Sequence, residues 1–436
     1  MSPRTRNFRT RLGIICVVGL IARLTVCCEL QHHPSVVSPA SVTDMATYQR
    51  LAREIVGGDW PDRFYYQPFY YAVFLPALYQ LGGSQPWFVM SAQAALGTLT
   101  VWLAGLLGAR LFGRRCGLVA AALLAISRIH IFYTPFTLIA VVSSFLLLLV
   151  TYLAVRAWQT ERILYWGLAG FAAALAVLTR GNALLLAPGI AALLLWRHRP
   201  QPAKACLALG VFLLFLCLPQ APFAWHNSRH LGRLAGPSTA MEAVLGLGNT
   251  PQAPPGGLAV PYPDTYHTWM AEARADGDAR VPLVHNVAEW ISHEPLAWAE
   301  LKFRMFLLFW NRLAIPNNIA LQNEGQSSRL LQLPLLLGFG TIGSLAVAGI
   351  LLGLPFSKRS PKRLFACYAV AVYCAGTVVF YVLTRFRLPL LPLLCIFAGT
   401  AVDALPRLVR RYRRNLRPRR FLLSAGAAYV CGGALV

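Results

Sequence analysis

The sequence predicts an all-α polytopic membrane protein with about eleven transmembrane helices, within a range of about 10–13. Hydrophobic residues make up 57% of the 436 residues, and charged residues only 13%. Soluble globular chains carry about 25% charged residues, so a polar surface cannot cover this chain. Apolar stretches of about 20 residues, long enough to cross a bilayer, recur along its length. Lipid is therefore the expected solvent for much of the molecule.

The expected spans are separated by short polar or basic stretches. Their approximate bounds are 12–29, 87–111, 116–133, 136–156, 164–180, 182–196, 204–224, 329–354, 364–384, 388–405 and 421–436. The whole chain, 1–436, is expected to form one transmembrane domain. The first span carries no small-residue cleavage site after its apolar run, which favours an uncleaved membrane helix over a signal peptide.

The distribution of basic residues predicts the orientation. The chain has 40 Lys and Arg against 16 Asp and Glu, a net charge of +24. This charge is divided into short clusters between apolar runs, which disfavours nucleic-acid binding and is typical of cytoplasmic loops. The cluster "RTRNFRTR" at 4–11 places the N-terminus in the cytoplasm. Basic clusters then fall in every second loop, so segments 30–86 and 225–328 are expected on the extracytoplasmic side.

The first outer segment, 30–86, predicts two amphipathic helices on the outer leaflet. From Asp44 onward, Met45, Tyr48, Ala52 and Ile55 recur at helical spacing before a pair of glycines. A second apolar helix, "QPFYYAVFLPALYQLGG" at 67–83, also ends in two glycines. Since the inner loops are bare linkers, chemistry or recognition is expected on the outer face.

The second outer segment, 225–328, has a less readable pattern. The stretch "GLGNTPQAPPGG" at 246–257 indicates turns. The apolar stretch at 301–310 is too short to span and is expected at the outer surface. Glu294 and Glu300 are interpreted as surface charges. An acceptor pocket is expected in this segment.

Asp44 has two interpretations. At the start of a helix it could be the N-cap, a role that Thr43 could equally fill. At the water–lipid boundary it could instead accept a proton from a hydroxyl nucleophile. The sequence leaves both roles open, and a cap does not exclude catalysis.

Five arginines are predicted near the outer ends of four different spans, where positive charge is disfavoured. They are Arg23, Arg128, Arg180, Arg385 and Arg387. Snorkelling to lipid headgroups could account for one or two of them. Together they indicate an anion, and a phosphate fits because guanidinium groups bind it in a bidentate manner.

Several familiar sites are missing from the sequence. There is no phosphate-binding Walker loop, no dinucleotide-binding glycine pattern, and no His/Cys spacing or CxxC pair typical of a metal site. No cofactor is therefore expected, and no metal ligand is assigned. An enzyme working outside the cytoplasm would need an activated donor carried by the membrane.

A set of weak motifs, in a fixed order, resembles the GT-C membrane glycosyltransferases. The resemblance is to the bacterial branch related to protein O-mannosyltransferases and the aminoarabinose (lipid A) transferase. The matching residues, in chain order, are Arg23; Asp44, Tyr48 and Ala52; Pro68 and Tyr70; "LTRGN" at 178–182; Gly248 and Asn249; and "RFRLPLLP" at 385–392.

The resemblance implies a polyprenyl-phosphate-linked sugar as donor and an acceptor hydroxyl on a lipid, glycan or protein. It makes Asp44 the catalytic base of an inverting transfer, of hexosyl or mannosyl type, at the periplasmic face of the bacterial plasma (inner) membrane. The substrate-binding residues it implies are Arg23, Tyr48, Arg128, Arg180, Asn249, Arg385 and Arg387.

Two departures from the family pattern bear on the mechanism. Met45 follows Asp44 where many relatives carry a second acid, and the outer start of the fourth span, "YTPFTLIAVVSS", has no acid. A divalent metal is therefore possible but not supported. The alternatives left open are a transporter or flippase of lipid-linked glycans, a glycan polymerase or ligase, and a catalytically degenerate family member.

Overall fold

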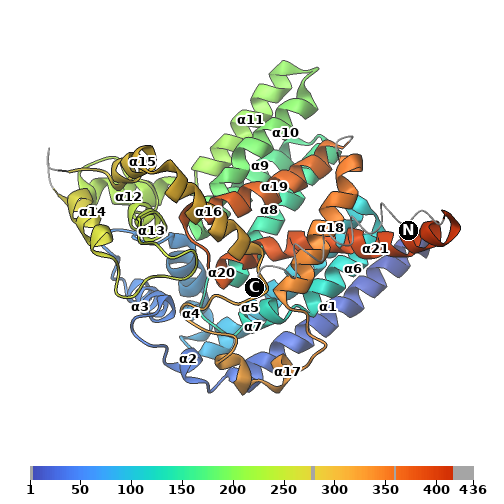
Figure 1. Ribbon diagram of the computed structural model, residues 1–436, viewed down its shortest axis with the longest axis horizontal. Helices are drawn as coiled ribbons and strands as arrows, with labels where there is room; N and C mark the ends of the chain where they lie inside the picture. The colour runs from blue at the N-terminus through green and yellow to red at the C-terminus, as the bar shows by residue number, and fades with distance from the viewer. Residues whose placement is uncertain (1–2, 276–279, 358–359, 416–436) are drawn as a thin grey trace.

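The structure is a computed structural model that describes residues 3–275, 280–357 and 360–415. Within these ranges the regular elements are helical (Figure 1), apart from an isolated bridge between Ser127 and Leu337. The predicted all-α class is confirmed.

Five helices in the described ranges are long and apolar enough to cross a membrane, and one bent pair can form a sixth span. The five stretches are Arg6–Leu30 in α1 (Pro3–Leu30), Pro86–Phe112 (α5), Ala140–Thr160 (α8), Pro361–Phe380 (α19) and Thr384–Pro406, which joins α20 (Thr384–Arg387), a 3-10 turn at Leu388–Leu390 and α21 (Leu391–Asn415). The bent pair is α11 (Pro202–Cys217) with α12 (Ala221–Leu231), at 53°. The chain is therefore a multi-pass membrane protein.

The remaining helices are shorter. They are α2 (Pro34–Val37), α3 (Asp44–Val56), a π-helical turn at Phe69–Phe74 leading into α4 (Leu75–Gly82), α6 (Arg114–Ala125), α7 (Arg128–Phe132), α9 (Ile163–Thr179), a 3-10 turn at Gly181–Leu185, α10 (Leu186–His198), α13 (Met241–Gly248), α14 (Asp264–Arg274), α15 (Leu283–His293), α16 (Pro295–Trp310), a 3-10 turn at Glu324–Ser327, α17 (Arg329–Gln332) and α18 (Phe339–Ser357). The total of about eleven spans stays a prediction, and the last expected span, 421–436, lies outside the described residues.

Small residues allow the helices of the bundle to approach closely, as is usual between membrane helices. A Cβ atom on Gly117 of α6 would lie 2.3 Å from the carbonyl oxygen of Gly105 in α5. On Gly170 of α9 it would lie 2.3 Å from the carbonyl oxygen of Phe212 in α11. These glycines let backbone pack directly against backbone where the hydrophobic effect between helices is absent.

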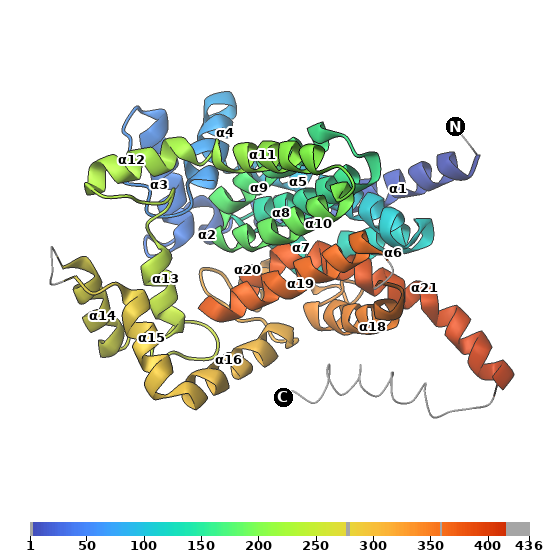
Figure 2. The same cartoon turned by 90° about the horizontal axis from the view of Figure 1, so that it is seen from above.

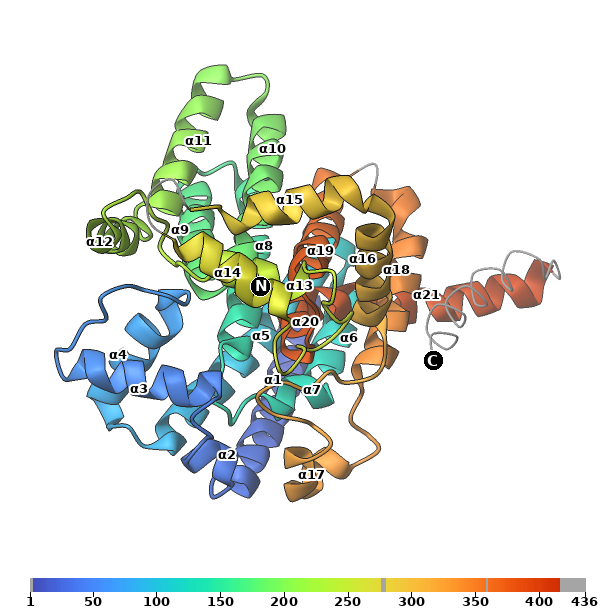
Figure 3. The same cartoon turned by 60° about the vertical axis from the view of Figure 1, so that its left-hand side comes forward.

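The two segments expected outside the membrane gather at one end of the bundle. In Figures 1 and 2, α2 to α4 and α12 to α16 lie together on the left, and Figure 3 turns this end toward the viewer. The buried side chain of Asn227 joins them, because its Oδ1 accepts from the backbone N–H of Phe64 at 2.7 Å. Helices occur at both positions expected in 30–86; their placement on the outer leaflet stays a prediction.

Candidate active site

Asp44 is the first residue of α3 and is not its cap. Thr43 takes the N-cap position, and its Oγ1 accepts from the backbone N–H of Ala46 at 3.4 Å. The sequence left this role open between the two residues. With the cap supplied by its neighbour, the Asp44 carboxylate is available for contacts outside its own helix.

The Asp44 carboxylate bonds two side chains from distant parts of the chain. Its Oδ2 accepts from Nη1 of Arg385 in an ion pair and from Nδ2 of Asn318 at 3.0 Å. No donor in the described part of the chain bonds Oδ1. The side chain of Asp44 keeps 23% of its surface exposed. One carboxylate oxygen is thus held in place while the other can receive a proton.

Arg385 and Asn318 reach Asp44 because their backbone segments pair with each other. Thr384 donates its backbone N–H to the carbonyl of Ile315 at 3.1 Å, and its Oγ1 accepts from the N–H of Ile315 at 2.5 Å. This short pairing brings the end of the second outer segment to the start of the last span. It fixes the positions from which both donors approach the carboxylate.

Arg180 adds a second positive charge to the site. Its guanidinium carbon lies 3.6 Å from the centroid of the Phe386 ring, and that of Arg385 lies 5.2 Å from the same ring. Among the residues that the structure describes, no carboxylate lies within ion-pair distance of Arg180. One guanidinium thus pairs with the carboxylate and a second lies on the neighbouring Phe386 ring, and this excess of positive charge favours an anion.

Tyr48 lies one turn after Asp44 at the centre of an aromatic cluster. Its ring lies 5.8 Å from that of Tyr66, 5.6 Å from that of Tyr70 and 6.1 Å from that of Tyr71. Burial, with the nearby Asp44 carboxylate, raises the pKa of Tyr48 well above its usual value and that of Tyr66 to about 12. Both phenols stay protonated at neutral pH, so they can donate hydrogen bonds but cannot act as bases.

The other three arginines predicted at this site bond protein groups. Arg387 donates to the backbone carbonyls of Asn311 at 2.6 Å and Leu313 at 2.8 Å. Arg128 donates to the carbonyl of Leu333 at 3.0 Å. The fully buried Arg23 donates to the carbonyl of Gly19 and hydrogen-bonds Nδ1 of His130, each at 2.8 Å. Only Arg180 and Arg385 share the surroundings of Asp44, and substrate binding by the other three stays a prediction.

Asn249, also predicted to bind substrate, holds the second outer segment against the bundle. Its side-chain amide donates to the carbonyls of Leu245 at 2.9 Å and Val379 at 2.8 Å, and its Oδ1 accepts from Nε1 of Trp298 at 3.1 Å. Lys302 makes the same connection, with Nζ donating to the carbonyls of Gly248 at 2.8 Å and Val379 at 3.0 Å. The Gly-Asn turn thus docks on the end of α19, a few residues before Arg385.

Gly248 is predicted to tolerate no side chain at this docking point. A Cβ atom there would lie 1.5 Å from the carbonyl oxygen of Phe380, so Gly248→Ala forces the two backbones apart. We expect a loss of about 3 kcal/mol or more, seen as a lower midpoint of thermal unfolding. Gly210→Ala is the control, because nothing lies within 4 Å of a Cβ there. An unchanged midpoint for Gly248→Ala would contradict the docking.

Lys302 is predicted to make stability depend on pH. Burial lowers the pKa of Lys302 from 10.5 to about 7. Between these values the unfolded chain binds one more proton than the folded chain, so the unfolding free energy rises with pH, by up to about 1.4 kcal/mol per unit. The midpoint of thermal unfolding should therefore rise between pH 7 and 9 more steeply in the wild type than in Lys302→Met. Identical pH profiles would refute this assignment.

Sequence reasoning missed Asn318 and Lys302. Asn318 lies in "IPNN", which matches no motif, and its proximity to Asp44 depends on the pairing of Ile315 with Thr384. Lys302 stands between Glu300 and Arg304 in the helix, so nothing in the sequence distinguishes it from a surface charge. No group of three or more His, Cys, Asp or Glu within the described ranges is placed to hold a metal ion.

Residues 66–225 match the family model described as dolichyl-phosphate-mannose-protein mannosyltransferase. No curated protein sequence gives a significant match to the chain.

Two solved structures share the fold. The oligosaccharyltransferase AglB from Archaeoglobus fulgidus, in complex with an inhibitory peptide and a dolichol-phosphate, aligns at a TM-score of 0.54 and 15% identity, covering 100% of this chain and 56% of that chain. ArnT from Cupriavidus metallidurans, bound to undecaprenyl phosphate, aligns at a TM-score of 0.51 and 15% identity, covering 90% of this chain and 60% of that chain. The chain thus spans little more than half the length of either. The resemblance predicted from the motifs is confirmed, and the chain has the fold of the GT-C membrane glycosyltransferases.

Proposed function

We propose that the protein transfers a sugar from a polyprenyl-phosphate donor to an acceptor hydroxyl, with inversion at the anomeric carbon. The observation that carries this proposal is the arrangement around Asp44. Its Oδ2 is held by Arg385 and Asn318. Among the described residues, Oδ1 accepts no bond and Arg180 has no carboxylate partner, so Arg180 adds positive charge to the site.

In the proposed reaction Oδ1 of Asp44 takes the proton of the acceptor hydroxyl. The hydroxyl oxygen forms a bond to the anomeric carbon from the face opposite the phosphate. The bond between that carbon and the phosphate oxygen breaks, and its electron pair leaves with the polyprenyl phosphate. A single displacement of this kind inverts the anomeric centre. Because a phosphate leaves without being protonated, one carboxylate can suffice, unlike the pair that inverting glycosidases use.

Arg180 and Arg385 would stabilise the departing phosphate. Fixed positive groups aimed at a developing charge lower the barrier most when they need not reorganise during the reaction. Arg385 is already ordered by its ion pair, and Arg180 by its position over the ring of Phe386. Tyr48 lies near Arg180 and Arg385, and its phenol is protonated. It can therefore donate a hydrogen bond to the sugar donor or to the acceptor substrate.

A lipid-linked donor agrees with the known relatives and with the surroundings of the site. AglB and ArnT have been solved with dolichol-phosphate and undecaprenyl phosphate, respectively. In this chain the proposed phosphate contacts come from Arg180, at the end of α9, and Arg385, at the start of the last long apolar stretch. We place this end of the bundle at the extracytoplasmic face of the bacterial plasma membrane, with a hexosyl donor such as a mannosyl lipid.

Purified protein in liposomes tests this function. Liposomes that carry polyprenyl-phosphate sugars, one sugar at a time, should yield glycosylated acceptor and free polyprenyl phosphate. A fluorescent analogue of the lipid reports movement between leaflets in the same vesicles. Product formation without stimulated lipid movement supports the transferase. Lipid movement without any product would instead indicate a flippase and overturn the proposal.

A further inference from the structure

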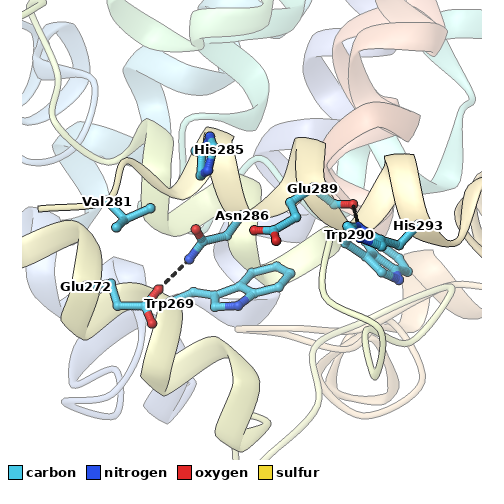
Figure 4. Close-up of a pocket in the computed structure, with 8 residues that line it drawn as sticks. All are labelled: Trp269, Glu272, Val281, His285, Asn286, Glu289, Trp290 and His293. Atoms are coloured by element: carbon cyan, nitrogen blue, oxygen red, sulfur yellow. Dashed lines mark hydrogen bonds between the residues drawn. The ribbon is translucent and has the colours of Figure 1, made fainter.

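A groove between α14 and α15 lies apart from the site at Asp44. Figure 4 shows the residues that line it. The groove is open to the surface and has a volume of about 580 Å³. This volume is within the range of pockets that bind small molecules, about 300–1,000 Å³. The residues that matter below are Trp269, Glu272, His285, Asn286, Glu289 and Trp290. None of them was singled out by the sequence motifs.

The groove combines aromatic faces with polar side chains. Trp269 is partly exposed, whereas Trp290 is buried with its Nε1 donating to Glu294 at 3.3 Å. Asn286 donates to Oε2 of Glu272 at 2.6 Å, which fixes both side chains across the groove (Figure 4). These hydrogen bonds hold the side chains that line the groove on both α14 and α15 in fixed positions.

Two polar groups of the groove remain available to a ligand. The side chains of His285 and Glu289 are exposed and make no hydrogen bond or ion pair with other residues in the part of the chain that the structure describes. A carboxylate accepts hydrogen bonds from hydroxyl or ammonium groups, and a neutral imidazole can donate or accept. The groove therefore offers polar partners beside the partly exposed indole of Trp269.

The charge of the groove limits what it can bind. Glu272 and Glu289 place two carboxylates here, although the chain as a whole has a net charge of +24. Like charges repel, so a phosphate or a carboxylated ligand is disfavoured. Binding of the polyprenyl-phosphate donor in the groove is therefore unfavourable. A ligand with hydroxyl or amine donors and an apolar face fits the available groups.

Aromatic contacts connect the groove to the site at Asp44. Tyr65 and Trp269 both pack against the small hydrophobic core of α13, α14 and α15. The ring of Tyr65 lies 4.9 Å from that of Tyr66, which lies 5.8 Å from that of Tyr48. The groove and the proposed base are thus on connected parts of the same end of the molecule.

We propose that this groove binds the carbohydrate part of the acceptor, as an uncharged or amine-bearing sugar. The apolar face of a pyranose ring would stack on Trp269, and its hydroxyl or amine groups would donate to Glu289. Donor and acceptor would then have separate sites, the first basic and the second acidic. This inference rests on the proposed transferase function for its biological role, but the binding itself does not require turnover.

Binding is tested on the full chain carrying Asp44→Asn and without any donor, so that no sugar is transferred during the titration. Isothermal titration uses trimers of N-acetylglucosamine, glucosamine, mannose and galacturonic acid as probes. We expect saturable binding of at least one of the first three and weaker binding of the acidic trimer. Trp269→Ala and Glu289→Gln should each weaken it by about tenfold or more. Trp225→Ala and Glu300→Gln, which change exposed residues outside the groove, should leave the affinity unchanged.

Several results would overturn the inference. These are no saturable binding of any trimer, tightest binding of the acidic trimer, or an affinity that neither groove variant changes. Preferential binding of an unglycosylated peptide at the groove would overturn it as well. In a transfer assay, Trp269→Ala should raise the KM for a glycan acceptor and leave the donor KM unchanged. If the protein binds the trimers in the groove but transfers no sugar, the proposal of a sugar-binding groove is supported and the transferase function is refuted.

Discussion

Asp44→Asn should reduce sugar transfer by about 10²–10⁴-fold in kcat, the usual contribution of a general base. The amide keeps the size of the side chain but cannot take a proton from the acceptor hydroxyl. Thr43 caps α3, so the helix should remain intact. The measurement is the initial rate of product formation in liposomes, with donor and acceptor at saturating concentrations.

Asp59→Asn provides the matched control, because Asp59 is an exposed acid in the same outer segment. It should transfer at the wild-type rate. The midpoints of thermal unfolding of both variants report whether either has lost structure. If Asp44→Asn unfolds like the wild type and keeps most of its activity, Asp44 is not the base.

Arg385→Gln is the second variant with a large expected effect. It removes the group that pairs with Asp44 and that we assign to the departing phosphate. Loss of one preorganised donor to a developing charge costs about 10²–10³-fold in kcat. Arg385→Lys should recover only part of this rate, because an ammonium group cannot contact two oxygens in the planar geometry of a guanidinium. The same transfer assay measures both variants.

Arg304→Gln is the control for this pair. Arg304 forms an exposed ion pair with Glu300 one turn away on α16, and such pairs contribute little. Its rate should match the wild type. A wild-type kcat for Arg385→Gln would show that the guanidinium does not act on the leaving group and would reassign that role to Arg180 or to another cation.

The spans and their breaks show what hydrophobic patterning can predict. The length of the apolar stretches alone predicted the long helices. This works because backbone N–H and C=O groups in lipid must form their hydrogen bonds within their own helix. It could not place the interruption before α18. The expected span 329–354 begins only at Phe339 in the structure, where residues 333–338 separate it from α17. There the backbone of Arg128 donates to Leu337, a contact between distant segments that no local pattern reports.

The arginines show the limit of the same reasoning for the site. The predicted membrane orientation placed five arginines near the outer ends of their spans, because charged residues are costly inside the apolar spans. It could not show which ones meet Asp44, because that depends on tertiary contacts. Arg387 is two residues from Arg385, yet it bonds the backbone at Asn311 and Leu313 while Arg385 bonds the carboxylate. The helical turn of α20 directs neighbouring side chains to different partners.

The outer segment 225–328 was the least predictable part of the chain. Its turns were evident from Gly and Pro, but the close approach of Gly248 to Phe380 was not. That approach requires α13 and α19, which are far apart in sequence, to meet end to end. The acidic groove of α14 and α15 was also not evident, since Glu272 and Glu289 are 17 positions apart and line one groove only after the chain turns back.

A structure of the protein with bound polyprenyl phosphate, determined by electron cryomicroscopy in lipid nanodiscs, tests the central claim most directly. That claim is that Arg180 and Arg385 receive the phosphate beside the Asp44 carboxylate. The phosphate should lie within hydrogen-bonding distance of both guanidinium groups, with Oδ1 of Asp44 still open to an acceptor. A phosphate bound at Arg128 or Arg23 instead, with no contact to Arg180 or Arg385, would contradict the account.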